Sequence, residues 1–223
     1  MPALAPLADP LARLGGSALA GVIRAMALRP AAKPLHPRGS VVDARLVHRM
    51  PDRPTGVPWL DTPGEEQVLA RLSRAVGLPG PLPDIQGMAL RVPLDSGAGD
   101  LLFASTGLGP ATRFLLTPAR HLDGRPLTTL LPYRTTRGPL LLALRATAAG
   151  RFQLLVSGLT GGWSVAGDLV LGQGTTDALV SFDPVRNELP GLTNYRWVRQ
   201  LRAPAYSVAR DQRRAPSDPA SRG

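Results

Sequence analysis

The sequence predicts an α+β fold in which an antiparallel β-barrel or sandwich lies between a helical arm and a C-terminal helix. Short apolar runs recur between residues 86 and 182, and Gly, Pro, Asp or Thr separates nearly every pair. Helical spacing of apolar residues marks both ends of the chain. The runs lie at 86–93, 100–105, 112–117, 139–146, 151–157, 163–171 and 178–182.

The N-terminal part predicts a helix followed by a strand. Residues 1–30 place Leu, Ala and Val on one helical face, and Pro30 and Pro34 end this arm. Residues 38–49 mix β-branched and other apolar residues, which is typical of a strand. A polar, proline-rich loop is expected at 50–63.

The segment before the repeated runs predicts another helix. Residues 65–76 begin with acids and carry apolar residues at helical spacing, although the same residues are compatible with a strand. Residues 77–83 are rich in Gly and Pro and predict a turn-rich connector. Residues 158–162 predict a hairpin turn, because a phosphate-binding loop would open a helix and carry Gly-Lys-Ser/Thr.

Most of the chain is expected to form one domain. We predict a helical arm over 1–30, the domain over 31–214 and a disordered tail over 215–223. The apolar stretch at 11–28 is interrupted by two arginines, and no stretch reaches the ~20 apolar residues of a membrane span. The sequence therefore predicts a cytoplasmic protein with an N-terminal helix rather than a signal peptide.

The composition excludes several kinds of site. The chain contains no cysteine, so disulfides, thiol nucleophiles and Cys-ligated metals are absent. Its three histidines, His36, His48 and His121, form no metal-binding motif with each other or with carboxylates. A dedicated metal site held by side chains alone is therefore not expected.

The net charge of +10 is unevenly distributed. Residues 196–223 hold seven arginines against Asp211 and Asp218. A solvated terminal helix and tail would explain this pattern, and so would an anionic ligand, an anionic membrane or nucleic acid. Nucleic acid is the least favoured partner, because aromatic residues make up only 4% of the chain and leave few stacking surfaces.

Four short segments stand out together because of their polar residues and their order. The first lies just before the predicted strand at 38–49, and the last falls in the C-terminal helical pattern. They read Lys33-Pro-Leu-His36-Pro-Arg-Gly39, then Ala70-Arg71-Leu72-Ser73, then Pro83-Asp84-Ile-Gln-Gly-Met-Ala-Leu-Arg91, and finally Phe182-Asp183-Pro184 followed by Leu201-Arg202-Ala-Pro-Ala-Tyr206-Ser-Val-Ala-Arg210.

In this order and approximate spacing, the four segments resemble the haem catalases over roughly residues 30–212. That family has a distal histidine in a His-x-x-Gly turn, an Arg-Phe-Ser, a Pro-Asp-x-Arg-Gly-Phe-Ala-x-Arg and a late Arg-x-x-x-Tyr that supplies the axial haem ligand. The resemblance implies a catalase-like antiparallel β-barrel with an N-terminal helical arm and a C-terminal haem-ligand helix. It also implies haem b as the cofactor.

The resemblance makes Tyr206 the iron ligand and Arg202 its charge partner. A free phenol ionises only near pH 10, and a guanidinium four residues earlier on one helical face would favour the phenolate. Phenolate ligation of haem is the known catalase arrangement. Pro204 lies between the two residues, so the helix either starts there or kinks. The alternative is a half-buried tyrosine beside a surface arginine.

The resemblance assigns proton transfer to His36, with Ser73 supporting its imidazole. Arg71, Lys33 and Arg210 would meet the haem propionates. The alternative for His36 is a surface histidine in a Pro-x-x-Pro turn.

The chain also departs from the family pattern. Lys33 stands where the family usually has an arginine, and a lysine cannot offer a bidentate fork. The distal asparagine has no equivalent, since the matching region offers Ser105 and Thr106. Phe103 is the only nearby aromatic residue, and the chain is much shorter than typical catalases.

The resemblance implies a haem-binding, catalase-like protein that decomposes peroxide or carries out peroxidase-type oxidoreduction on a small molecule. One alternative is a catalase-fold barrel without haem or activity that acts as a ligand-binding or interaction protein. Another is a basic module for nucleic acid or an anionic membrane. The sequence does not decide whether the chain is an enzyme, and analogy with the family implies a homo-oligomer.

Overall fold

The computed structural model describes residues 39–78, 81–95, 97–174 and 180–199. All of them belong to one compact unit, Leu35–Gly223. Among these residues no helix has the length and apolar character needed to cross a membrane.

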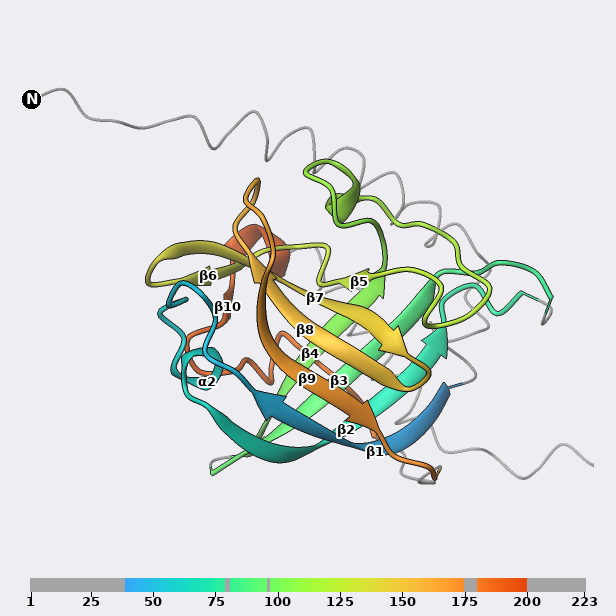
Figure 1. The fold of residues 1–223 in the computed structure, drawn as a ribbon, viewed down its shortest axis with the longest axis horizontal. Coiled ribbons are helices and arrows are strands. Elements are labelled where there is room, and N and C mark those ends of the chain that lie inside the picture. The colour runs from blue at the N-terminus through green and yellow to red at the C-terminus, as the bar shows by residue number, and fades with distance from the viewer. Residues whose placement is uncertain (1–38, 79–80, 96, 175–179, 200–223) are drawn as a thin grey trace, which may run out of the picture. The chain divides into compact units, whose positions relative to one another are not determined.

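Eight antiparallel strands form a closed barrel (Figure 1). Around the barrel the order is β7, β5, β4, β3, β2, β1, β9 and β8, and pairing of β8 with β7 closes the ring. Two short strands, β6 (Tyr133–Thr135) and β10 (Thr193–Asn194), extend the sheet beyond β7. The barrel strands are β1 (Gly39–His48), β2 (Gly64–Arg74), β3 (Gln86–Leu94), β4 (Gly97–Ser105), β5 (Leu127–Thr128), β7 (Gly138–Ala148), β8 (Arg151–Ser157) and β9 (Ser164–Leu171).

Alternation along the strands fills the barrel with apolar side chains. On β1, Val42, Ala44 and Leu46 point into the core, and on β2 Val68 and Ala70 do the same. The residues between them face outward. The inner face of each strand therefore forms the core, and the outer face is available for a binding site.

The strands predicted at 86–93, 100–105, 139–146, 151–157 and 163–171 are confirmed as β3, β4, β7, β8 and β9, and that at 38–49 as β1. The turn predicted at 158–162 is confirmed, since it joins the antiparallel strands β8 and β9. The loop at 50–63 contains one short helix, α2 (Pro58–Asp61).

The helix predicted at 65–76 is wrong, because this segment forms strand β2. Ten residue pairs join β2 to β1, and six join it to β3. Its apolar residues fit the pleat as well as they fit a helix, with Val68 and Ala70 buried and Leu69 facing out. Pairing on both sides decides between the two patterns.

Two further strand predictions fail. Residues 112–117 contain a short 3-10 helix, η1 (Thr112–Phe114), because Arg113 turns inward and bonds to loop carbonyls. Residues 180–182, the described part of 178–182, are not in a strand. Residues 196–199 form a helical turn after Tyr195, and the rest of the predicted C-terminal helix lies outside the described residues. The arm at 1–30 and the tail at 215–223 lie outside the described residues.

Candidate functional site

The outer face of β1–β4 carries two rows of residues, most of them small. Strand register places Gly39, Ser73, Gly87 and Ala104 side by side across the four strands, and the next row reads Val41, Arg71, Ala89, Leu102. All eight belong to the outward-facing set, because the intervening residues form the core. We call these two rows the β1–β4 shelf.

A glycine keeps part of the shelf flat. A Cβ added at Gly87 would lie 2.9 Å from Ser73 Oγ, so only glycine leaves this surface flat without a shift of Ser73. Val41 and Ala89 are each only 6% exposed, although neither belongs to the barrel core. The shelf is therefore a mostly apolar surface, on which Arg71, Ser73, Leu102 and Ala104 remain partly exposed.

Two of the residues assigned from the sequence lie on this shelf. Arg71 and Ser73 are neighbours on the outer face of β2, in adjacent rows. Ser73 pairs with Gly39, the first residue of β1 and the last of the first segment. The other assigned residues, Lys33, His36, Arg202, Tyr206 and Arg210, lie outside the described residues.

Asp84, in the third of the four sequence segments, stabilises a turn. Its fully buried carboxylate accepts backbone hydrogen bonds from Val76, Gly77, Leu78 and Ile85, at 2.7–3.1 Å. Burial by itself raises the pKa of Asp84, but these four N–H groups outweigh that effect and leave the pKa below its ordinary value. Asp84 therefore shapes the turn between β2 and β3.

Arg91, at the end of the same segment, pairs with Asp100 in a row directly beside the shelf. Its guanidinium donates to both carboxylate oxygens, Nε at 2.8 Å and Nη2 at 2.7 Å. The sequence analysis missed Asp100 as the partner. The available signal was symmetry, since Arg91 and Asp100 lie at equal distance from the β3–β4 turn.

Ser105 and Thr106, which the resemblance sets in the region of a distal asparagine, are both engaged in internal hydrogen bonds. Ser105 Oγ accepts from Gln86 N at 3.0 Å and donates to Thr117 O at 2.7 Å. Thr106 Oγ1 lies 3.0 Å from Thr128 Oγ1. Both are fully buried, and Phe103 points into the barrel core, so none of the three supplies a polar or aromatic group to the shelf.

Arg113 is a buried cation that the sequence did not reveal. Burial lowers the pKa of Arg113, and its guanidinium lies 4.8 Å from the centre of the Trp163 ring. It ties the 108–113 loop to the turn between β8 and β9, and no local sequence pattern marks this role. Its acceptors are Leu108 O, Gly109 O, Gly158 O, Gly161 O and Ser157 Oγ, at 2.9–3.2 Å.

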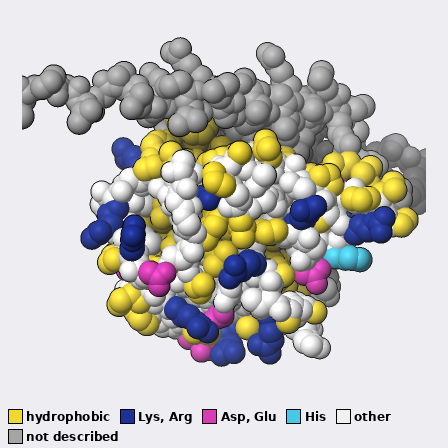
Figure 2. Space-filling model, turned by 45° about the horizontal axis from the view of Figure 1, so that its top comes forward, with side chains coloured by type: hydrophobic (Ala, Val, Ile, Leu, Met, Phe, Trp, Pro, Cys, Tyr) yellow, Lys and Arg dark blue, Asp and Glu magenta, His cyan; other side chains and the backbone are white. Residues whose placement is uncertain are grey.

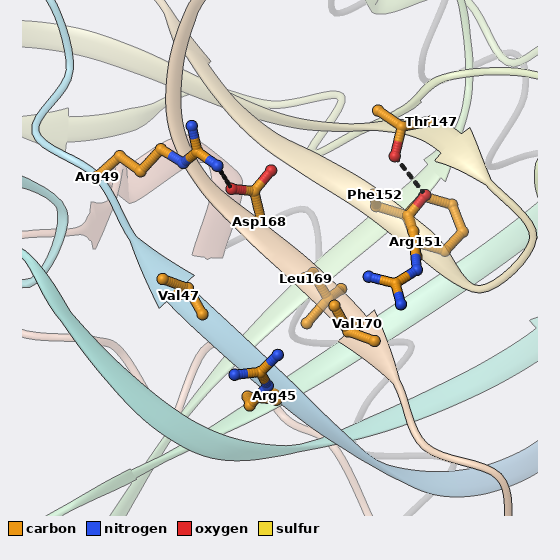
Figure 3. A pocket seen from close by; sticks show the side chains of 9 residues that line it. All are labelled: Arg45, Val47, Arg49, Thr147, Arg151, Phe152, Asp168, Leu169 and Val170. Atoms are coloured by element: carbon orange, nitrogen blue, oxygen red, sulfur yellow. Dashed lines mark hydrogen bonds and ion pairs between the residues drawn. The ribbon is translucent and has the colours of Figure 1, made fainter.

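A shallow pocket of about 330 Å³ lies elsewhere, on the outer face of β1, β9 and β8 (Figure 3). Register places Arg45 and Arg151 on either side of Val170, and Arg49 forms an ion pair with Asp168. We call these five residues the arginine face. Arg45 also pairs with Glu65 at 3.2 Å, with about half of each side chain exposed. Solvent and the carboxylates of Asp168 and Glu65 therefore offset much of the positive charge of the arginine face.

On one face of the molecule, charged side chains of both signs are interspersed (Figure 2). On the face shown in Figure 2, arginines stand apart around hydrophobic side chains, with acidic side chains among them. Within the described part of the chain, no group of three His, Asp or Glu side chains could hold a metal ion. We take the β1–β4 shelf as the candidate site because of its flat, mostly apolar rows.

Comparisons with known proteins support the fold alone. No family model matches the chain, and no curated protein matches its sequence. Among solved structures, a bacterial catalase aligns with a TM-score of 0.55 at 12% identity, over 95% of this chain and 62% of the catalase. A fungal catalase aligns at 0.57 and 13%, over 96% and 64%. Catalase A from Saccharomyces cerevisiae aligns at 0.57 and 12%, over 96% and 66%.

The chain therefore spans less than two thirds of the length of the catalases it matches. At 12–13% identity the likeness concerns the arrangement of the strands and not the chemistry. The domain has a catalase-like β-barrel fold.

Proposed function

We propose that the chain is a haem-binding protein in which the β1–β4 shelf receives one face of haem b. The observation that supports this most directly is the shelf itself, two rows of Gly, Ala, Ser, Val and Leu interrupted by one arginine. A planar macrocycle needs a flat apolar surface, and its propionates need a cation near the edge. The described residues fit that half of a haem site.

Residues outside the described ranges would complete the site. Tyr206 would ligate iron, with Arg202 favouring the phenolate, and Lys33, Arg71 and Arg210 would meet the propionates. His36 is three residues before Gly39, so its Cα lies within about 11 Å of Gly39. Gly39 pairs with Ser73, and this register supports the proposal that Ser73 holds the imidazole, a role that the resemblance implies.

Bound haem would supply an iron centre for reactions of peroxides. In this proposal the imidazole of His36 would accept and return the peroxide proton, and Ser73 would keep that imidazole oriented. The small side chains of the shelf exclude water from one face. Ser105 and Thr106 are bonded elsewhere, so no described side chain replaces the distal asparagine. We therefore expect slow peroxidase-type oxidoreduction rather than efficient disproportionation.

An absorption spectrum tests the proposal. The protein is expressed with a haem precursor, purified and compared with Tyr206→Phe and with Tyr195→Phe as a matched control. We expect a Soret band of high-spin ferric character that Tyr206→Phe abolishes and Tyr195→Phe retains. A wild-type protein that is colourless and refuses added hemin, or a band unchanged in Tyr206→Phe, would overturn it.

The second candidate is a barrel of the same fold that works without haem. The internal bonds of Ser105 and Thr106 favour it, because they leave the region of the missing asparagine without a free polar side chain among the described residues. In that case the shelf would hold another flat apolar ligand. Saturable uptake of one haem per chain, with a Tyr206-dependent spectrum, would rule this candidate out.

A further inference from the structure

The arginine face places two cations on either side of one small apolar residue. Register puts Arg45, Val170 and Arg151 in one row across β1, β9 and β8, and all three point outward, since their neighbours along the strands lie in the core. Adjacent strands are about 4.8 Å apart, so the Cα atoms of the two arginines are about 10 Å apart. Figure 3 shows their guanidinium groups on opposite sides of Val170.

Nearby carboxylates leave part of this positive charge uncompensated. Glu65 pairs with Arg45 at 3.2 Å, and Asp168 pairs with Arg49. Among the residues that the structure describes, no carboxylate forms an ion pair with Arg151. Cations in one row of a sheet repel each other, and an anion bound between Arg45 and Arg151 would remove that repulsion.

Two more charged residues border the face, one on each side. Arg145, on β7, donates to the neutral side chain of Gln153 at 2.6 Å, so this bond leaves its charge uncompensated. On the other side, Asp43 is the next outward residue of β1 before Arg45. A long polyanion laid across the face would meet Asp43 and Glu65 as well as the arginines. A small anion above Val170 would meet mainly the arginines.

The space above Val170 is a pocket of about 330 Å³. Val47 and Val170 form the partly exposed apolar part of its lining, whereas Phe152 and Leu169 belong to the barrel core. Sites for small molecules usually have volumes of about 300–1,000 Å³, so this pocket is near the lower limit. Its shape and lining therefore suit a small anion that carries a short apolar group.

Two guanidinium groups on opposite sides suit a phosphate better than a carboxylate. A carboxylate has two oxygens, and the fork of one arginine can satisfy both. A phosphate monoester has three acceptor oxygens and about two negative charges at neutral pH, so it can accept hydrogen bonds from two arginines at once. The cations of this face are all arginines, which bind phosphate with a planar, bidentate group.

We propose that the arginine face binds the phosphate group of a small phosphorylated molecule, between Arg45 and Arg151 and above Val170. The two guanidinium groups hold the phosphate oxygens, and the apolar part of the ligand lies on Val47 and Val170. This site is on other strands than most of the β1–β4 shelf, and it does not depend on whether the shelf receives haem.

The test is a titration of the full chain with phenyl phosphate, followed through the chemical shifts of the backbone amides. Benzoate is the matched probe, because it carries the same ring on a carboxylate. The variants are Arg151→Gln, which removes the unpaired cation, Arg151→Lys, which keeps the charge without the fork, and Glu65→Gln, which releases Arg45 from its carboxylate. Arg125→Gln is the control, since Arg125 is an exposed arginine in the loop before β5.

We expect saturable shifts at amides of β1, β8 and β9 with phenyl phosphate, and binding of benzoate that is about tenfold weaker. Arg151→Gln should weaken the binding of phenyl phosphate about tenfold, Arg151→Lys should fall between that variant and the wild type, and Arg125→Gln should match the wild type. Glu65→Gln should bind about threefold more tightly, because the carboxylate no longer competes for Arg45. Damage to the fold would not produce that gain in affinity.

Several results would overturn the site. Phenyl phosphate that causes no saturable shifts on β1, β8 and β9, or that binds no better than benzoate, would show that these arginines are ordinary surface charges. Unchanged affinity in Arg151→Gln would have the same meaning. Tighter binding of a dT oligonucleotide, or of vesicles that contain phosphatidic acid, would assign the face to a nucleic acid or a membrane in place of a small molecule.

Discussion

The β1–β4 shelf and the arginine face lie on the outside of one barrel and share strand β1, yet they differ in the types of residue that form them. The shelf consists mostly of small or apolar residues, and the row beside it holds a fully buried carboxylate. The arginine face holds three arginines around Val170, with Asp168 paired to one of them, and the ion pair that Arg45 forms with the neighbouring Glu65 is about half exposed on both sides. Strand alternation alone would permit either composition on either face.

The difference indicates which positions should tolerate substitution and which should not. Exposed ion pairs contribute little and tolerate substitution, because water solvates the charges when the pair is broken. Buried carboxylates that accept several N–H bonds cannot be replaced without leaving donors unsatisfied. The polar groups around the shelf belong to the second kind, so changes there should have much larger effects than matched changes on the arginine face.

The largest contrast should appear between Asp84→Asn and Asp168→Asn. Asp84 accepts four backbone N–H bonds in a fully buried turn, and an amide can accept only part of them. We expect Asp84→Asn to lower the free energy of unfolding by about 3 kcal/mol. Asp168→Asn, on the arginine face, should cost less than about 1 kcal/mol. Urea unfolding at pH 7 measures both, and equal losses would remove the contrast.

Acid should reduce the contribution of Asp84 in a defined direction. Because the folded pKa of Asp84 lies below its ordinary value, the stability it provides is complete above the unfolded pKa of about 4. That stability is lost as pH falls from there through the lowered folded pKa. The difference in unfolding free energy between wild type and Asp84→Asn should therefore shrink between pH 6 and pH 3. A difference that is constant or grows in acid would contradict this assignment.

The fold could be read from the sequence where each strand carries its own signal. Strand β8 was predicted at 151–157 and lies there, because alternation and flanking Gly residues mark it locally. Strand β2 could not be distinguished from a helix, since its apolar spacing fits both and only pairing with β1 and β3 decides. Arg113 was missed because some of its acceptors lie in a turn about 45 residues further along the sequence, at Gly158.

The site could be predicted only in part, because it too depends on contacts between distant parts of the sequence. The motifs pointed to Arg71, Ser73, Asp84 and Arg91, but local sequence does not say which of them face a ligand. Register places Arg71 and Ser73 on the shelf and joins Arg91 to Asp100. The shelf itself is a row across four strands, so no single stretch of sequence contains it.

Filling the shelf should weaken haem binding with little effect on the fold. Gly87→Val places a branched side chain on the shelf in a strand that tolerates it, and Ser73 Oγ is the near atom that has to move. We expect the dissociation constant for hemin to rise at least tenfold, or about 1.4 kcal/mol. Gly64→Val is the matched control, because nothing lies within 4 Å of a Cβ at that position. Equal hemin affinities in the two variants would place the ligand elsewhere.

The smallest effect is expected on the arginine face, at the Arg45–Glu65 pair. The two side chains are 47% and 51% exposed and 3.2 Å apart, so each is well solvated when the other is removed. Arg45→Gln, Glu65→Gln and the double variant should each change the unfolding free energy by less than about 0.5 kcal/mol, with a coupling energy that vanishes in high salt. A coupling above about 1 kcal/mol that survives salt would mean that this face is held as firmly as the shelf. The contrast between the two faces would then lie in their shape and no longer in how their charges are bound.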